Sequence, residues 1–312
     1  MRAAEQRHDG TRRLGDRMFS GLASGSGLVI LAILAGVALF LLVEAWPAIS
    51  APAGDIPGKG GLGSYVAPLA FGTVLSSAIA LVVATPLAVA IALFITHYAP
   101  RSLGQGLGYL VDVLAAIPSI VYGMWGVGVL TSASVGPQKW LGDHLGFIPF
   151  FAGPVSLTGR TMLVTGLVLA VMILPIITAI VREIFLQTPA LHQEAALALG
   201  ATRWEMIRTA VLPFGKSGIM SGAMLGLGRA LGETMAVAFL LSSSGGITVN
   251  LIGSANPGTI AANIALDFPY ANGLGVNVLI ATGLVLFAIT LAVNMTARAI
   301  VNRGPSAQGG DL

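Results

Sequence analysis

The chain has 312 residues, of which 55% are hydrophobic and only 9% are charged, and its formal net charge is +3. A soluble domain carries about 25% charged residues, so these proportions exclude a chain that covers itself with a polar surface in water. The absence of cysteine excludes disulfides, iron–sulfur clusters and thiolate chemistry, and the four scattered histidines lack the spacing of metal ligands. The composition predicts an integral membrane protein that binds no metal.

Six apolar runs are long enough to cross a bilayer, which requires about 20 residues. The first follows three arginines, as a signal peptide does, but its uncharged stretch at 18–43 exceeds the signal-peptide core of about 7–15 residues. We therefore expect an all-α, polytopic membrane domain over 21–298, between an N-terminal arm at 1–20 and a tail at 299–312. The expected spans are 21–43, 69–96, 109–132, 161–181, 218–242 and 276–298.

The lysines and arginines predict the orientation of the chain. When both termini are placed on one side, that side carries twelve of these residues, and the other side carries only Lys59, Lys139 and Arg160. Basic residues accumulate in the cytoplasmic loops of membrane proteins. Both termini, and the loop between the fourth and fifth spans, are therefore expected in the cytoplasm.

That loop carries signals for two short helices over 188–212. Pro189 at a first helical position is typical of a helix start, and Gly200 is typical of a helix end. Thr202 and Glu205 have the spacing of a capping box, which opens a second helix. A helical hairpin is therefore expected to protrude into the cytoplasm.

The hairpin is suited to docking, because small Ala195 and Ala196 permit close approach and Trp204 can serve as an anchor. A DNA-binding helix-turn-helix is disfavoured, since the segment is tethered between two spans and has few basic residues. A P-loop over 210–217 is disfavoured because Pro213 is expected to end the second helix there. The alternative to a docking site is an amphipathic surface hairpin.

Two charged residues lie inside the fifth expected span, where a central arginine costs at least about 2.5–3.5 kcal/mol. They are Arg229 and Glu233, which would lie on one face of a continuous helix because they are four residues apart. Arg229 can hold an oxyanion in its planar guanidinium, and Glu233 would weaken that binding enough for release. The alternative is an ion pair that only holds helices together. The same face, expected to meet a partner helix or a water-filled path, carries Gly218, Gly222, Gly226 and Ala236.

Three other polar positions have simpler interpretations. Asp112 is expected at the start of the third span, where the helix dipole favours a carboxylate. Arg182 and Glu183 end the fourth span and are interpreted as an anchor at the membrane surface. Ser119 either lines the path or bonds back to its own helix, and both interpretations stay open.

Several stretches resemble a known family. The hairpin resembles the coupling loop of ABC-importer permeases, in the positions Glu194-Ala195-Ala196, Gly200 and Leu212-Pro213. Ala210 departs from that pattern, which usually has isoleucine there. The run RALGETMAV at 229–237 closely resembles the signature of PstC-type phosphate permeases, and the stretches at 116–123 and 172–177 are similar to the same family.

The resemblance implies the ABC importer type I permease fold, in a bacterial plasma-membrane protein that is not itself an enzyme. It implies a heterodimer with a PstA-type permease, two PstB-type ATPase subunits that hold ATP and Mg²⁺, and an extracytoplasmic phosphate-binding protein. No nucleic-acid partner is expected. The residues expected at the ATPase are Glu194, Ala195, Ala196, Gly200 and Trp204. The residues expected along the substrate path are Arg229, Glu233, Thr234 and Ser119.

The predicted function is import of inorganic phosphate by alternating access. An ABC permease for another oxyanion, such as sulfate or molybdate, is the nearest alternative, because those permeases share the Arg-Ala-Leu-Gly-Glu part of the signature. An ion-coupled secondary carrier would use Arg229 and Glu233 as a proton relay. That alternative leaves the docking hairpin without a purpose.

Overall fold

The computed structural model describes residues 2–58, 60–244 and 246–302, and the side chains at 15–58, 60–244 and 246–299. Within these ranges every named element is helical, which confirms the all-α prediction. Six of the described helical segments are long and apolar enough to cross a membrane, as predicted. They are Gly15–Ser50, Gly61–Tyr98, Ser119–Leu145, Met162–Leu186, Arg203–Leu231 and Leu274–Ala299.

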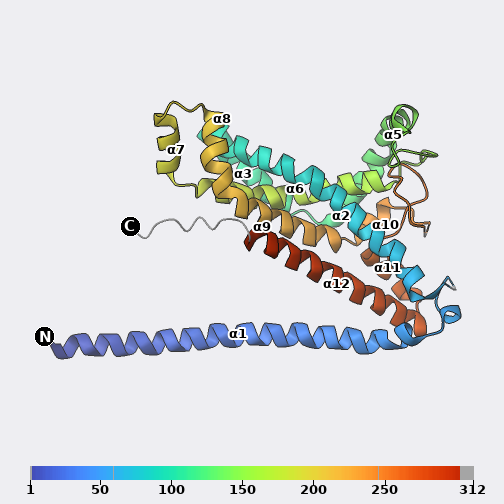
Figure 1. Cartoon of the computed structure of the whole chain (residues 1–312), viewed down its shortest axis with the longest axis horizontal. Helices are drawn as coiled ribbons and strands as arrows, with labels where there is room; N and C mark the ends of the chain where they lie inside the picture. The colour runs from blue at the N-terminus through green and yellow to red at the C-terminus, as the bar shows by residue number, and fades with distance from the viewer. Residues whose placement is uncertain (1, 59, 245, 303–312) are drawn as a thin grey trace.

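Five long helices run along the long axis of the molecule in Figure 1: α1 (Arg2–Ser50), α2 (Gly61–Leu93), α6 (Met162–Leu186), α9 (Leu212–Leu231) and α12 (Leu274–Asn302). The start of α1, the end of α12 and the hairpin helices α7 (Ala190–Ala198) and α8 (Arg203–Met206) lie at one end of the molecule, here called the hairpin end. This agrees with the relative placement expected from the basic residues. The remainder of the predicted tail, 303–312, lies outside the described residues.

The remaining elements connect these helices. Between α2 and α6 the chain forms η2 (Phe94–Tyr98), α3 (Arg101–Ala115), α4 (Ser119–Trp125), η3 (Gly126–Leu130) and α5 (Thr131–Leu145). η1 (Ala53–Asp55) precedes α2, and η4 (Ile207–Val211) joins α8 to α9. After α9 come α10 (Met235–Leu240), α11 (Ile260–Asp267) and η5 (Phe268–Tyr270).

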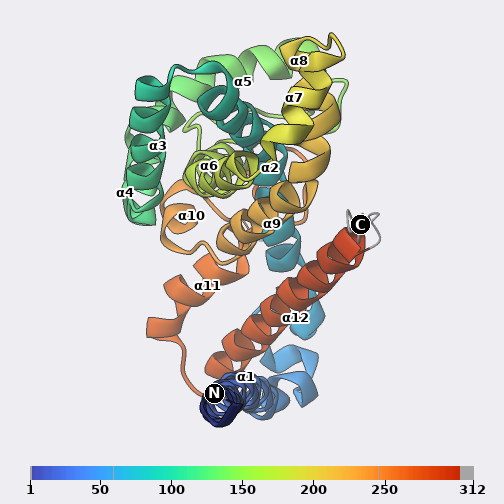
Figure 2. The ribbon, with the colours of Figure 1, turned by 90° about the vertical axis from the view of Figure 1, so that its left-hand side faces the viewer.

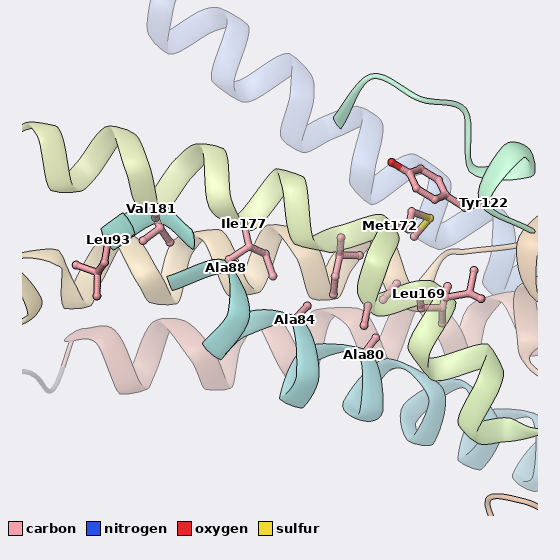
Figure 3. Close-up of a cluster of buried hydrophobic side chains, with 14 of the residues drawn as sticks. Ala80, Ala84, Ala88, Leu93, Tyr122, Leu169, Met172, Ile177 and Val181 are labelled. Atoms are coloured by element: carbon pink, nitrogen blue, oxygen red, sulfur yellow. The ribbon is translucent and has the colours of Figure 1, made fainter. Parts of the chain in front are cut away.

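The core of the fold is the contact between α6 and its neighbours. Figure 2 shows α6 nearly end-on, with α2, α3 and α9 around it. A helix that is apolar on all sides is expected in the interior, and Leu169, Ile173, Ile177 and Val181 of α6 are fully buried. The facing positions of α2 are small, which permits the close approach that stabilises helix pairs in membranes. These buried positions are Ala80, Ala84, Ala88 and Ala92, and the first three are labelled in Figure 3.

The glycine face predicted for the fifth span also packs on α6. A Cβ atom at Gly218 would overlap the side chain of Ile184, and one at Gly226 would lie 2.9 Å from Ile177. These glycines therefore face a helix of the same chain, which is the first of the two expected possibilities.

This packing makes a prediction about stability. Gly218→Ala is expected to lower the melting temperature, because Ile184 must move and overpacking of this kind costs about 1–3 kcal/mol. Gly228→Ala, in the same helix, is the matched control, since a Cβ atom there meets no atom within 4 Å. Thermal unfolding of the purified variants measures both, and equal melting temperatures would contradict the packing described here.

α1 stands apart from this core. It packs on α12 through a second apolar cluster, which contains Ala45, Ala48, Ile56, Val278 and Ala281. The Asn277 side chain donates a hydrogen bond to the backbone carbonyl of Glu44 at 2.7 Å. None of the most apolar window of α1 is buried within the described chain, so this helix presents its apolar surface outward.

The predicted third span, 109–132, is wrong. The chain breaks between α3 and α4, where Pro118 precedes the first residue of α4. Proline lacks an N–H and disfavours a helical conformation in the residue before it, and Pro118 itself is extended with a ψ of 138°, so α3 ends before it. The segment long enough to span is Ser119–Leu145. α3 runs across the view of Figure 2, in which α6 is seen end-on.

The interpretation of Asp112 as a helix-start carboxylate is wrong for the same reason. Asp112 lies in the last turn of α3, where its Oδ2 atom pairs with Nη2 of Arg182 at 3.3 Å. Gly108 makes the pair possible, because a Cβ atom there would overlap the Arg182 guanidinium. The ion pair joins α3 to α6 near the hairpin end.

Candidate functional site

The fifth span is interrupted beside its charged residues. α9 ends at Leu231, Gly232 is its C-cap, and α10 begins at Met235. The prediction of one helix over 218–242 is therefore wrong, and so is the inference that Arg229 and Glu233 share one helix face. Irregular backbone at membrane depth is tolerated only where it is buried in protein or lines a cavity, and broken helices frequently mark transport sites.

Two side chains of the signature stabilise this break. The Glu233 Oε1 atom accepts a hydrogen bond from the backbone N–H of Ala236 at 3.1 Å, and Glu233 is buried. The Thr234 hydroxyl donates to the backbone carbonyl of Gly232 at 3.2 Å. In a continuous helix the Ala236 N–H and the Gly232 carbonyl would bond to each other. Glu233 and Thr234 therefore replace one helical hydrogen bond by two side-chain bonds.

Arg229 does not pair with Glu233. Among the described side chains the only ion pair within 4.0 Å joins Arg182 and Asp112. Arg229 instead is exposed in an open cavity of about 810 Å³ between α9 and α12. The described residues that line the cavity include no carboxylate; its polar members are Arg229, Arg298, Asn294 and Ser221.

Three of these residues were not predicted as site residues: Arg298, which was counted only among the basic residues, Asn294 and Ser221. The available signal was the spacing of Asn294 and Arg298, which places them four residues apart on one face of the last span. That spacing gives no information about which helix the face meets.

α4 brings a second predicted stretch against the break. A Cβ atom at Gly123 would lie 2.8 Å from the Cα atom of Ala236, so α4 and α10 touch backbone to backbone. Two of the stretches that resemble PstC-type permeases, 116–123 and 229–237, therefore meet in the fold. Ser119 opens α4 and is half-buried, outside the cavity that Arg229 lines. Its place on the path stays a prediction.

The predicted hairpin is present, with Gly200 and Thr202 in the expected roles, whereas Pro189 is the N-cap of α7 and not its first helical residue. Gly200 has a φ of +87°, and the N–H groups of Gly200 and Ala201 donate to the carbonyls of Leu197 and Ala196. This pair of bonds is the Schellman arrangement that ends helices. The capping box is also formed, since the Thr202 N–H donates to Glu205 Oε2 at 2.7 Å and the Glu205 N–H to Thr202 Oγ1 at 3.3 Å.

The expectation that Pro213 ends the second helix is wrong. α8 continues through η4 into α9, so that Arg203–Leu231 is one helical span. η4 has the wide hydrogen-bonding pattern of a π-helix, which accommodates a proline in the following turn because the regular bonding register is shifted there. One continuous helical segment, which bends between α8 and α9 in Figure 1, thus joins the hairpin to the region of Arg229.

The predicted coupling residues divide into two groups. Glu194, Ala195 and Gly200 are exposed, and Trp204 is 55% exposed. Ala196 is half-buried and packs against the core cluster, so it faces the bundle. The hairpin also exposes the apolar side chains of Leu191, Leu197 and Leu199. An exposed apolar surface of this kind, on a protruding element, is typical of a protein-docking site.

Residues 84–303 match the family described as the binding-protein-dependent transport system inner membrane component. The chain belongs to this family. Among its relatives is the phosphate transport system permease protein PstC 2 of Mycobacterium tuberculosis, which is 44% identical over 92% of each chain. Another is the PstC protein of Mesorhizobium japonicum, which is 39% identical over 93% of this chain and 91% of that protein. The predicted resemblance to PstC-type permeases is confirmed.

Two solved structures of bacterial ABC transporters contain chains with a similar fold. A chain of a bacterial ABC transporter involved in alginate import has a TM-score of 0.51 and 16% identity, over 89% of this chain and 96% of that chain. A chain of a bacterial alginate ABC transporter, solved in complex with alginate-bound periplasmic protein, has a TM-score of 0.53 and 17% identity, over 77% and 79%. The predicted ABC-importer permease fold is confirmed, in a multi-pass membrane protein.

Proposed function

We propose that this chain is the PstC-type permease subunit of an ATP-binding-cassette importer that moves inorganic phosphate into the cytoplasm. The observation that carries the proposal is the 44% identity to PstC 2 over 92% of each chain. The site supports it physically. An arginine lines an open cavity without a described carboxylate, which suits an oxyanion that must bind and leave.

The complex that we propose has a PstA-type permease, two PstB-type ATPase subunits and an extracytoplasmic phosphate-binding protein. The exposed hairpin is its docking site for an ATPase, which holds ATP and Mg²⁺. Because α8, η4 and α9 form one helical span, a displacement of the hairpin is transmitted along that span toward Arg229. Movement of the ATPase can thereby change the substrate path, as alternating access requires.

Transport assays separate phosphate from the alternatives. The complex reconstituted in liposomes, with ATP on the ATPase side and binding protein on the other, is expected to take up radiolabelled phosphate. Excess sulfate or molybdate is expected to leave this uptake unchanged. Competition by either anion would favour a permease for that oxyanion, and uptake driven by a proton gradient without ATP would favour a secondary carrier.

The cytoplasmic placement of the hairpin end is part of the proposal and rests on the basic residues. Single cysteines report it cleanly, since the chain has none. We expect a membrane-impermeant reagent to label Ser244→Cys in intact cells and Gln187→Cys only after permeabilisation. Both residues are exposed, so burial does not mask the result. The reverse labelling pattern would overturn the orientation.

A further inference from the structure

The cavity between α9 and α12 contains a second arginine that the proposed function does not use. Arg298 and Asn294 of α12 line it together with Arg229 of α9. Between them on α12, Ala297 is buried and also lines the cavity, and α12 contacts α9 in the fold. Both polar side chains therefore come from the part of α12 that borders the same cavity as Arg229.

The cavity extends along α9 from the break toward the hairpin end. Its lining on α9 includes Ser221 and Arg229, which are eight residues and therefore about 12 Å apart along the helix. Arg298 lies close to the end of α12 at the hairpin end, whereas Arg229 lies close to the opposite end of α9. The cavity is thus long enough for separate contacts at its two arginines.

An arginine near the end of a membrane helix often reaches the headgroup region without further function. Arg298 differs from such an arginine because it lines a cavity that Arg229 also lines. Both guanidinium groups line one cavity in which the described lining includes no carboxylate, so no described ion pair neutralises either of them there. Arginine binds phosphate oxygens through two parallel N–H donors, and the Asn294 amide supplies further donors.

We propose that Arg298 and Asn294 form a second binding site for a phosphate group, on the hairpin side of Arg229. The inference rests on the proposed function in one respect: if inorganic phosphate is the substrate, this site receives it after Arg229 and before the cytoplasm. The same chemistry would also hold the headgroup of an anionic lipid. The two sources of the phosphate group require different experiments.

A cysteine reporter in the cavity tests the site without relying on transport. The Ser221→Cys variant of the full complex, in nanodiscs of phosphatidylcholine, is labelled with a neutral maleimide. Inorganic phosphate is expected to slow the labelling. Arg298→Gln is expected to raise the phosphate concentration for half-maximal slowing by about tenfold, which corresponds to the loss of one charge-assisted contact.

Three comparisons control this measurement. Arg298→Lys keeps a point charge and is expected to lie between the wild type and Arg298→Gln. Arg101→Gln removes an exposed arginine outside the cavity and is expected to change nothing. Labelling of Ser102→Cys, also exposed and outside the cavity, should not respond to phosphate. In buffer without inorganic phosphate, slowing caused by adding phosphatidylglycerol to the nanodiscs, and abolished by Arg298→Gln, would identify the lipid headgroup as the ligand.

The site is overturned if neither inorganic phosphate nor phosphatidylglycerol slows the labelling of Ser221→Cys, or if Arg298→Gln leaves the slowing unchanged. Phosphate uptake by the wild-type complex is measured in parallel. Uptake without protection of the reporter rejects the site and leaves the proposed function intact. Protection that depends on Arg298, in a complex that does not transport phosphate, supports the site and rejects the function.

Discussion

Arg229→Gln is expected to assemble normally into the complex and to lose phosphate uptake by roughly hundredfold. The size of the effect corresponds to about 3 kcal/mol, the loss of two charge-assisted hydrogen bonds to the substrate. Assembly should be preserved because Arg229 lines an open cavity and forms no ion pair within 4.0 Å among the described side chains. Its replacement therefore leaves no buried carboxylate without its partner.

The initial rate of uptake, divided by the amount of assembled complex, measures this effect. Arg229→Lys should keep part of the activity, since an ammonium retains the charge without the planar pair of donors. Arg160→Gln is the control, because this arginine is exposed in the loop before α6. Uptake at the wild-type rate by Arg229→Gln would remove Arg229 from the substrate path.

Two substitutions of Glu233 separate the effect of its negative charge from the effect of its capping hydrogen bond to Ala236. Glutamine keeps a side-chain oxygen that can accept from the Ala236 N–H, whereas alanine removes the acceptor. Loss of such a cap costs about 0.5–2 kcal/mol, so Glu233→Ala should melt at a lower temperature than Glu233→Gln. A change of uptake in Glu233→Gln at normal stability would show that the charge acts in release. Equal melting temperatures would contradict the capping role.

The long helices were predictable because each depends on many residues at once. An apolar run of about 20 or more residues predicts a span even when single residues within it are polar. The number of spans could therefore be predicted from the sequence. The breaks depend on single side chains. Pro118 lies at a break, whereas Pro86, Pro175 and Pro213 lie inside helical segments. Proline alone therefore does not identify a break.

The site was predictable to the extent that its chemistry is unusual for its position. Arg229 was found because a charge in an apolar run has a high energetic cost. Its neighbours were not, because the contact between Arg298 and the cavity arises when α12 packs on α9. The role of Glu233 as a cap was also hidden, since the apolar pattern continues past 232–234 and the side-chain hydrogen bonds at the break are not visible in the sequence.

Gly200→Val is expected to abolish phosphate uptake by separating the permease from its ATPase. Gly200 has a φ of +87°, a conformation that costs a residue with a β-carbon about 1–2 kcal/mol and a β-branched one more. The energetic cost of valine arises from the backbone conformation and not from a clash with neighbouring residues, because a Cβ atom at this position meets no atom within 4 Å. The turn between α7 and α8 must therefore change its path, and Trp204 and the exposed leucines of the hairpin are displaced from one another.

The test pairs two substitutions at the same position. Asparagine adopts the left-handed conformation more readily than other residues with a side chain, so Gly200→Asn should retain most ATPase binding and uptake. Gly106→Val is the matched control in α3, where the added Cβ atom also meets nothing within 4 Å and no positive φ is required. Co-purification of the ATPase measures docking directly. If Gly200→Val retained the ATPase and transported normally, the hairpin would not be the docking site, and the helical span from α8 to α9 would lose its role in transmitting the movement to Arg229.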